Sequence, residues 1–169
     1  MGSAYLRFTK DSNEVKEFVA WWEWLAENRG ERAVLRRCGT LTEVVLTPAY
    51  HRLRQAVSRN GRVYDDGLAL LAGMAAKVKT HKSGSSIAEQ MAAGKPENPD
   101  GTARISGLRF RRLLKAKDHE ALFTPLGRVI ALLNGEANIE SLAQSIYFWN
   151  DKSRKNWAFD YYTKAPSEK

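Results

Sequence analysis

Residues 68–78, with the sequence Leu-Ala-Leu-Leu-Ala-Gly-Met-Ala-Ala-Lys-Val, are apolar at nearly every position. A helix formed here would be hydrophobic around almost its whole circumference. Such a helix is stable only when other elements bury it on all sides. We therefore expect this stretch to be the central helix of an N-terminal helical lobe.

More helices are expected before this stretch. The first is marked by apolar residues at helical spacing, namely Val15, Phe18, Val19, Trp22 and Leu25. We expect it to begin at a capping pair, Asp11 and Glu14, and to end at Gly30. Thr47 followed by Pro48 predicts a further helix start, because a threonine side chain caps a free amide and proline suits the first turn.

The composition changes to Ser, Gly, Pro and Lys over residues 79–103. Only Ser86 and Glu89 interrupt this pattern, with the spacing of a capping box that starts a short helix. A connection of this length is unusual inside a compact domain. We expect a flexible linker containing that short helix, between an N-terminal lobe at 1–78 and a C-terminal lobe at 104–169.

Helical periodicity returns in the second half of the chain. Helices are expected over 106–117, over 118–133 with Pro125 inside, around 139–149, and after Asn150 up to Pro166. No segment has the alternation of a strand. The predicted fold class is all-α, with two small helical-bundle lobes.

The composition favours a folded, basic protein. Lys and Arg number 27 against 19 Asp and Glu, which gives a net charge of +8, and 43% of the residues are hydrophobic. A disordered tail would contain a smaller fraction of hydrophobic residues, so we expect a folded protein. The excess of positive charge suits binding to a polyanion. The single cysteine, Cys38, points to a reducing compartment, so we expect a cytoplasmic protein with no membrane segment and no export signal.

Catalytic signatures are missing from the sequence. The histidines, His51, His81 and His119, stand far from matching partners, and no glycine loop has the Gly-Lys-Ser or Gly-Lys-Thr of a nucleotide site. A triad can still assemble from distant residues, so this lowers the expectation of an enzyme without removing it. We expect a non-enzymatic protein with no cofactor and no metal.

The strongest local signal for function is the segment 104–117. It holds six Lys and Arg in fourteen residues and no acid. On a helix, Arg109 and Arg112 lie three apart and Arg111 and Lys115 four apart, so each pair shares a face. Exposed helix faces usually mix both signs, so this one is better explained by phosphate binding, which releases condensed counterions.

Several separated segments, taken in order, resemble one known family. They are the Trp-rich first helix, Arg36-Arg37, Thr47-Pro48-Ala49-Tyr50-His51-Arg52-Leu53, the apolar helix around Gly73 leading to Ser86-Ile87-Ala88, Ser106 through Leu114, Leu126 with Arg128, Tyr147-Phe148-Trp149, and Trp157-Ala158-Phe159-Asp160-Tyr161-Tyr162. This order is similar to that of the small subunit of the type I-E CRISPR surveillance complex Cascade, the CasB family.

The resemblance implies a two-lobed helical protein that forms a head-to-tail pair in the belly of Cascade. Its partners would be the other Cascade subunits, the guide RNA, and the target and non-target DNA strands. The resemblance also implies that the protein does not cleave nucleic acid. Its basic residues would stabilise the guide RNA and the target DNA strand, and would hold the displaced strand of the R-loop. This fits a system in which base pairing reads sequence and protein stabilises the exchange of strands.

The candidate nucleic-acid-binding residues come from this resemblance and from charge. Positions that match the family's basic residues are Arg36, Arg52, Arg109, Lys115, Arg128 and either Lys152 or Arg154. Charge clusters alone add Arg37, Lys79, Lys82, Arg111 and Arg112.

Three other functions stay open at this stage. A helix-turn-helix regulator would need a recognition helix, and no pair of helices in the sequence stands out as one. A protein-interaction scaffold would use Trp21, Trp24 and Phe148 as a partner surface. A nuclease would be revealed by cleavage of RNA or DNA in the presence of magnesium.

Overall fold

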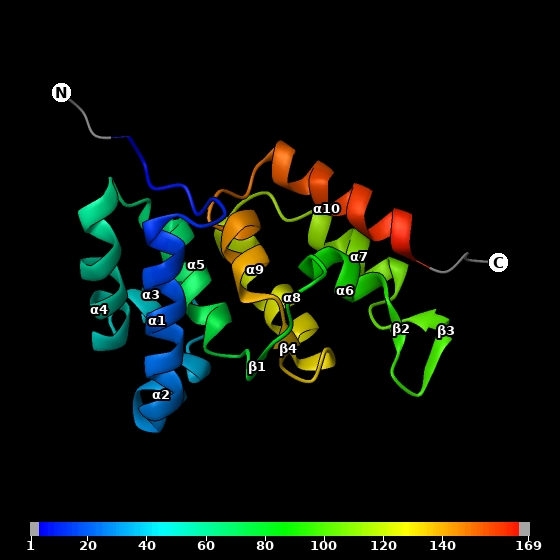
Figure 1. Ribbon diagram of the computed structural model, residues 1–169, viewed down its shortest axis with the longest axis horizontal. Helices are drawn as coiled ribbons and strands as arrows, with labels where there is room; N and C mark the ends of the chain where they lie inside the picture. Colours follow the sequence, from blue (N-terminus) through cyan, green and yellow to red (C-terminus); the bar gives the residue numbers. More distant parts are fainter. Residues whose placement is uncertain (1–3, 166–169) are drawn as a thin grey trace.

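The apolar stretch predicted as the central helix forms α5 (Asp65–Ala75), and the other elements are assembled around it (Figure 1). The structure is a computed structural model in which residues 4–165 are described. Every residue of α5 from Gly67 to Ala75 is buried. The helix contacts α3, α8 and α9 as well as its sequence neighbours, so its apolar circumference is covered as expected.

Four helices precede α5. They are α1 (Asn13–Glu27), α2 (Arg29–Arg37), α3 (Leu41–Val45) and α4 (Pro48–Val57), with a 3₁₀ turn at Ser58–Asn60. The predicted start of α4 is confirmed, because the Thr47 hydroxyl accepts a hydrogen bond from the Tyr50 amide at 3.2 Å. The indole of Trp21 is buried and donates to the Ala49 carbonyl at 2.9 Å, which ties α1 to α4.

The predicted ends of the first helix were wrong. Ser12, not Asp11, caps α1, and Asp11 itself adopts a positive φ of 62°. The helix also stops before Gly30, at Asn28, whose side-chain amide donates to the Trp24 carbonyl at 2.8 Å. The next helix, α2, begins at Arg29, so Gly30 lies inside α2 and does not terminate a helix.

Four helices make up most of the second half. They are α7 (Gly107–Leu114), α8 (His119–Leu132), α9 (Ile139–Ile146) and α10 (Asp151–Lys164). Side chains of Ser, Asp and Asn cap all four N-termini. The helix α8 runs through Pro125 without a break. The last helix was expected to end before Pro166; it ends at Lys164, and Pro166 lies outside the described residues.

Residues 79–103 contain short strands that the sequence did not predict. Here lie β1 (Thr80–His81), α6 (Ile87–Ala92), β2 (Gly94–Lys95) and β3 (Asn98–Ala103). The strand β1 pairs in parallel with β4 (Glu136–Ala137), and β2 pairs with β3 as an antiparallel hairpin. The strands β1, β2 and β4 have two residues each and are too short to show alternation, whereas the six residues of β3 include Pro99 and Gly101 and do not alternate apolar with polar side chains. The all-α prediction thus holds for most of the chain and needs this correction.

The short helix predicted after Ser86 is α6, and it begins with the expected capping box. Its apolar side chains are fully buried, and the helix packs against α10. The Ser86 hydroxyl also donates to Asp160 of α10 at 2.8 Å. This part of the segment is held in place by packing and hydrogen bonds. The division into lobes at 1–78 and 104–169 stays a prediction.

The two halves of the chain are joined by a buried aromatic cluster. The Tyr147 hydroxyl accepts a hydrogen bond from the Tyr64 amide at 2.7 Å. The His119 Nε2 lies 2.9 Å from the Tyr147 carbonyl, so this nitrogen carries the proton and donates. The Tyr64 ring packs edge-on against the His119 ring at 5.2 Å. One hydrophobic core therefore runs through both halves.

Because Tyr147 is buried, we expect the free energy of unfolding to fall at alkaline pH. Burial raises the pKa of Tyr147 to about 12, against about 10 in an unfolded chain. Between these values the unfolded chain releases a proton that the folded protein keeps, so the free energy of unfolding falls as pH rises. In urea titrations from pH 8 to 12, Tyr147→Phe should show a weaker fall than the wild type. An equal fall in both proteins would contradict this assignment.

Candidate nucleic-acid interface

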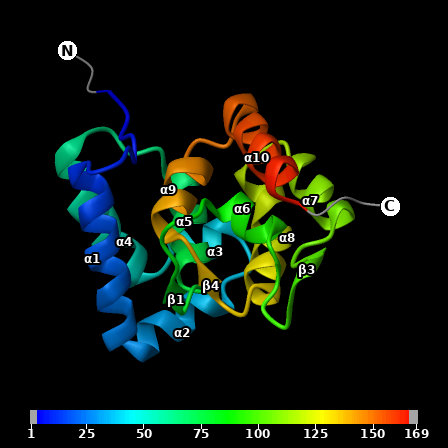
Figure 2. The ribbon, with the colours of Figure 1, turned by 45° about the vertical axis from the view of Figure 1, so that its right-hand side comes forward.

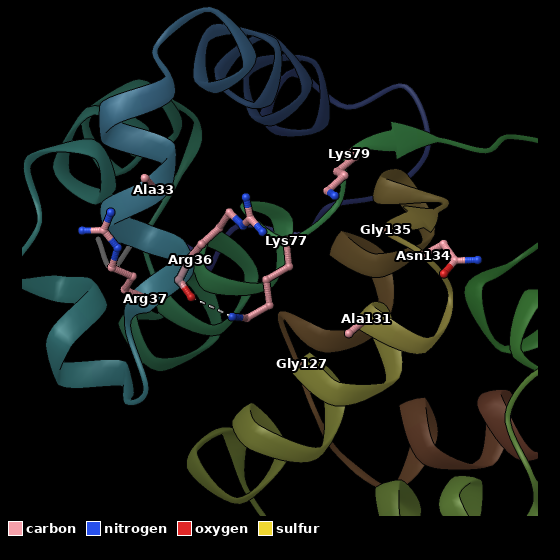
Figure 3. A pocket seen from close by; sticks show the side chains of 9 residues that line it. All are labelled: Ala33, Arg36, Arg37, Lys77, Lys79, Gly127, Ala131, Asn134 and Gly135. Atoms are coloured by element: carbon pink, nitrogen blue, oxygen red, sulfur yellow. Dashed lines mark hydrogen bonds between the residues drawn. The ribbon is translucent and has the colours of Figure 1, made fainter.

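A basic groove lies between α2, the end of α5 and the C-terminal end of α8 (Figure 3). We call it the α2–α8 groove; its volume is about 680 Å³. Four cationic side chains line it, and no acidic residue does. The lining residues are Ala33, Arg36, Arg37, Lys77, Lys79, Gly127, Ala131, Asn134 and Gly135.

The main chain fixes the two lysines of the α2–α8 groove. The Lys77 ammonium donates to the Arg36 carbonyl at 3.0 Å, and its stem passes Gly127, where a Cβ would lie 3.3 Å from Cε (Figure 3). The Lys79 amide donates to the Gly135 carbonyl at 2.7 Å. Gly135 has a φ of 72°, which favours glycine, and its missing side chain leaves room for the Lys79 stem.

The electrostatics of the α2–α8 groove favour an anion. Burial lowers the pKa of Lys77, and the positive charge of Arg36 lowers it further. The negative charge of a phosphate placed between these groups would raise the pKa of Lys77 again and would offset the repulsion between Lys77 and Arg36. The small side chains on the groove wall also allow a sugar-phosphate backbone to approach closely, and Arg can bind phosphate oxygens in pairs.

A second basic site lies between α7 and α8. Arg109 and Arg112 of α7 meet Arg128 of α8 around a hollow of about 60 Å³. We call it the α7–α8 hollow. All three arginines are exposed, as are Arg111 and Lys115 elsewhere on α7. The fold therefore brings Arg128 next to Arg109, which lies nineteen positions earlier in the sequence. The guanidinium groups around the hollow are open to solvent.

Some predicted residues already have partners within the molecule. Arg52 is exposed but stacks on the Trp24 ring, with 4.3 Å from Cζ to the ring centre. Lys82 lies 3.6 Å from the Glu136 carboxylate. Lys152 is exposed and lines a separate groove beside the N-terminal segment.

Two arginines, one in the basic segment 104–117 and one in α10, donate hydrogen bonds to carbonyl groups at helix ends. Arg154 donates from Nε to the Leu114 carbonyl at 2.7 Å, which satisfies the end of α7. Arg104 belongs to the acid-free segment, but its side chain is only 14% exposed and it donates to the Leu133 carbonyl at 3.0 Å. Charge counting could not separate these arginines from the exposed ones.

The structure also adds cations that the sequence did not select. Lys77 lies in the apolar stretch and was not among the candidate residues, but it lines the α2–α8 groove. Arg7 and Lys10 line the same groove as Lys152. These two lie in a segment without helical periodicity, which gave no means of assigning them a face. Within residues 4–165, no group of three or more His, Cys, Asp and Glu could hold a metal ion. No helix of the described residues is long and apolar enough to cross a membrane.

Comparison with known families decides the affiliation of the chain. The family model described as CRISPR-associated protein Cse2 matches residues 31–162. The chain belongs to the Cse2 family. Cse2 is CasB, so the family predicted from the sequence is confirmed. The matched range includes both the α2–α8 groove and the α7–α8 hollow.

A solved structure supports the fold of this Cse2 family member. The chain is similar to one chain of a crystal structure of E. coli Cascade bound to a PAM-containing double-stranded DNA target. The TM-score is 0.69 at 19% sequence identity, over 89% of this chain and 94% of the other. At this identity the likeness shows the fold alone. None of the curated proteins matches the chain.

Proposed function

We propose that this chain is a non-catalytic, nucleic-acid-binding subunit of a type I-E Cascade complex. Its basic surface stabilises the guide RNA and target DNA and holds the displaced strand of the R-loop. The observation that carries this proposal is the α2–α8 groove, in which four cations meet with no acid in the lining. Cys38 is buried and forms no disulfide, which fits a protein that works in the reducing cytoplasm.

Three further observations support a role in binding the nucleic-acid backbone. The α7–α8 hollow offers three more exposed arginines, and the chain belongs to a CRISPR-associated family. The structure that shares its fold is that of a complex bound to DNA. Contacts of Lys and Arg with phosphates carry no sequence information, which suits a subunit that must accept any target.

The proposal predicts modest binding of the isolated protein to single- and double-stranded DNA, falling steeply with salt. The variant Arg109→Ala/Arg112→Ala should bind more weakly and reduce the slope of log K against log[salt] by about 1.5. Its melting temperature should stay near the wild-type value, because both side chains are exposed. Fluorescence anisotropy over a salt series, with calorimetry, measures both quantities.

Three outcomes would contradict this function. A flat salt response of the wild-type protein would mean that phosphate contacts do not drive binding. Protection of one discrete palindromic site in footprinting would favour the sequence-specific regulator instead. Products formed from RNA or DNA in the presence of magnesium would favour the nuclease.

Assembly into Cascade is the other part of the proposal. We propose that a second copy binds head to tail and that the pair contacts the other Cascade subunits. Exposed apolar side chains favour a protein contact, notably Leu46 at 77% and Phe159 at 69% exposed. Co-purification with guide RNA and the remaining subunits tests this partnership. A chain that enters the complex but binds no nucleic acid would be a scaffold.

A further inference from the structure

A groove separate from the two basic sites lies between the N-terminal segment and the junction of α9 with α10. It has a volume of about 760 Å³ and is lined by aromatic, cationic and amide side chains. We call it the N-terminal groove. The N-terminal segment and the start of α10 lie at the top in Figures 1 and 2, while α2 lies at the bottom of both views.

The N-terminal segment is held firmly beside this groove. The Leu6 amide donates to the Arg62 carbonyl at 2.8 Å, and the Arg62 amide donates to the Ala4 carbonyl at 2.9 Å. Leu6 and Phe8 are buried in the core, so the alternation of an extended chain turns Tyr5 and Arg7 outward. The exposed residues of the groove are therefore placed by buried neighbours.

An aromatic wall forms one side of the N-terminal groove. The Tyr5 side chain is 43% exposed and meets the Phe148 ring edge-on, with 6.4 Å between ring centres. Phe148 is partly buried and packs on Tyr64 and Tyr147 behind it. These rings already pack against one another, so stacking on them costs less side-chain freedom than stacking on isolated rings.

Cations surround this wall. Arg7, Lys10 and Lys152 are exposed and line the groove, and no acidic residue does. Lys152 lies in the first turn of α10, where the helix dipole adds partial positive charge. The nearby Glu14 carboxylate accepts a hydrogen bond from the Arg7 amide at 3.3 Å.

Amide side chains complete the set. Gln144 and Asn156 are exposed in the groove, and each offers both donors and acceptors of the kind found on base edges. Asn150 is less available, because its Oδ1 caps α10 by accepting from the Ser153 amide at 3.0 Å. Aromatic, cationic and amide groups in one groove match the base, phosphate and polar edge of a nucleotide.

We infer that the N-terminal groove seats an unpaired nucleotide of a single strand, with its base against Tyr5 and Phe148. The adjacent phosphates lie near Arg7, Lys10 and Lys152. A duplex hides the faces of its bases, so this groove favours single strands, unlike the backbone contacts of the other two sites. The inference rests on the proposed nucleic-acid binding and adds a site that distinguishes single from double strands.

The path of a strand can extend beyond Tyr5. A neighbouring groove of about 670 Å³ shares Tyr5 and is lined by Arg59 and Arg62. The Arg62 guanidinium lies 4.8 Å from the Tyr5 ring centre. Tyr5 therefore lines two grooves that each contain cations, as a backbone running past a stacked base requires.

Photocrosslinking of the full-length wild-type protein tests the inference directly. A single-stranded oligonucleotide carrying 5-iododeoxyuridine is irradiated with the protein, and mass spectrometry locates the crosslinked residues. We expect crosslinks at Tyr5 or Phe148, reduced by an excess of unlabelled single strand more than by duplex. Crosslinks found only outside the N-terminal groove would overturn the inference.

Affinity measurements provide a second test with a matched control. Tyr5→Leu should weaken single-strand binding about fivefold or more, as loss of a stacked base does, and leave duplex binding unchanged. The control is Tyr162→Leu, which removes a tyrosine of similar exposure, 50%, that lies outside the groove. Equal losses for single strand and duplex, or equal losses in both variants, would overturn the inference.

These results separate this inference from the function on which it rests. If the wild-type protein binds neither single strands nor duplex, the proposed function fails and the inference fails with it. If binding depends on the α2–α8 groove but no crosslink appears at Tyr5 or Phe148, only the inference fails.

Discussion

Gly67→Ala is expected to lower the free energy of unfolding by about 3 kcal/mol, which corresponds to about 6–12 °C in melting temperature. Gly67 lies in the first turn of α5 and faces the backbone of Tyr147. A Cβ at this position would lie 2.1 Å from the Tyr147 carbonyl oxygen and 3.1 Å from its ring. Contacts this short force the backbone to move.

The Tyr147 carbonyl has little freedom to yield to such a methyl group. It accepts a hydrogen bond from His119 Nε2 at 2.9 Å, and the Tyr147 hydroxyl is bonded to the Tyr64 amide. A shift of this residue would therefore loosen the contacts that join α5 to α8 and α9. Thermal unfolding followed by circular dichroism measures the loss.

Gly30→Ala is the matched control for this prediction. Gly30 lies in α2, is exposed, and has no atom within 4 Å of a Cβ built on it. Alanine forms helices better than glycine, so this variant should gain up to about 1 kcal/mol. If both variants lost the same stability, the close approach to Tyr147 would not be the cause.

The sequence predicted the elements of the fold that depend on local signals. The buried α5 follows from its apolar circumference, α4 from Thr47-Pro48, and α6 from the capping box at Ser86. The contact between Gly67 and Tyr147 joins residues eighty positions apart, so no local sequence pattern predicts it. The short parallel pair of β1 and β4 likewise depends on tertiary structure.

The candidate site was predictable in its residue types but not in its grouping. Helical spacing identified the exposed face of Arg109 and Arg112, yet it could not show that Arg128 joins them. The α2–α8 groove depends on α2 lying beside the end of α8, so Arg36 and Lys79 meet only in the folded chain. Arginines that bind carbonyl groups, such as Arg104 and Arg154, look the same in sequence as arginines free to bind phosphate.

Removing three cations of the α2–α8 groove should cause the largest loss of nucleic-acid binding. In Arg36→Ala/Arg37→Ala/Lys79→Ala, each lost phosphate contact lowers the salt slope by about 0.7–0.9, so the slope should fall by about 2. We expect affinity at low salt to drop about a hundredfold. Anisotropy titrations over a salt series measure both the slope and the affinity.

Stability should be nearly unchanged in this variant, because all three side chains are exposed and none takes part in an ion pair between residues 4 and 165. The control is Lys16→Ala/Lys95→Ala/Lys164→Ala. This variant also removes three positive charges from the net charge of +8, but from exposed positions that line neither the α7–α8 hollow nor any of the three grooves described above. Because both variants reduce the long-range field equally, the difference between them isolates the groove. Equal losses would mean that net charge, and not the arrangement of cations between α2 and α8, attracts the nucleic acid.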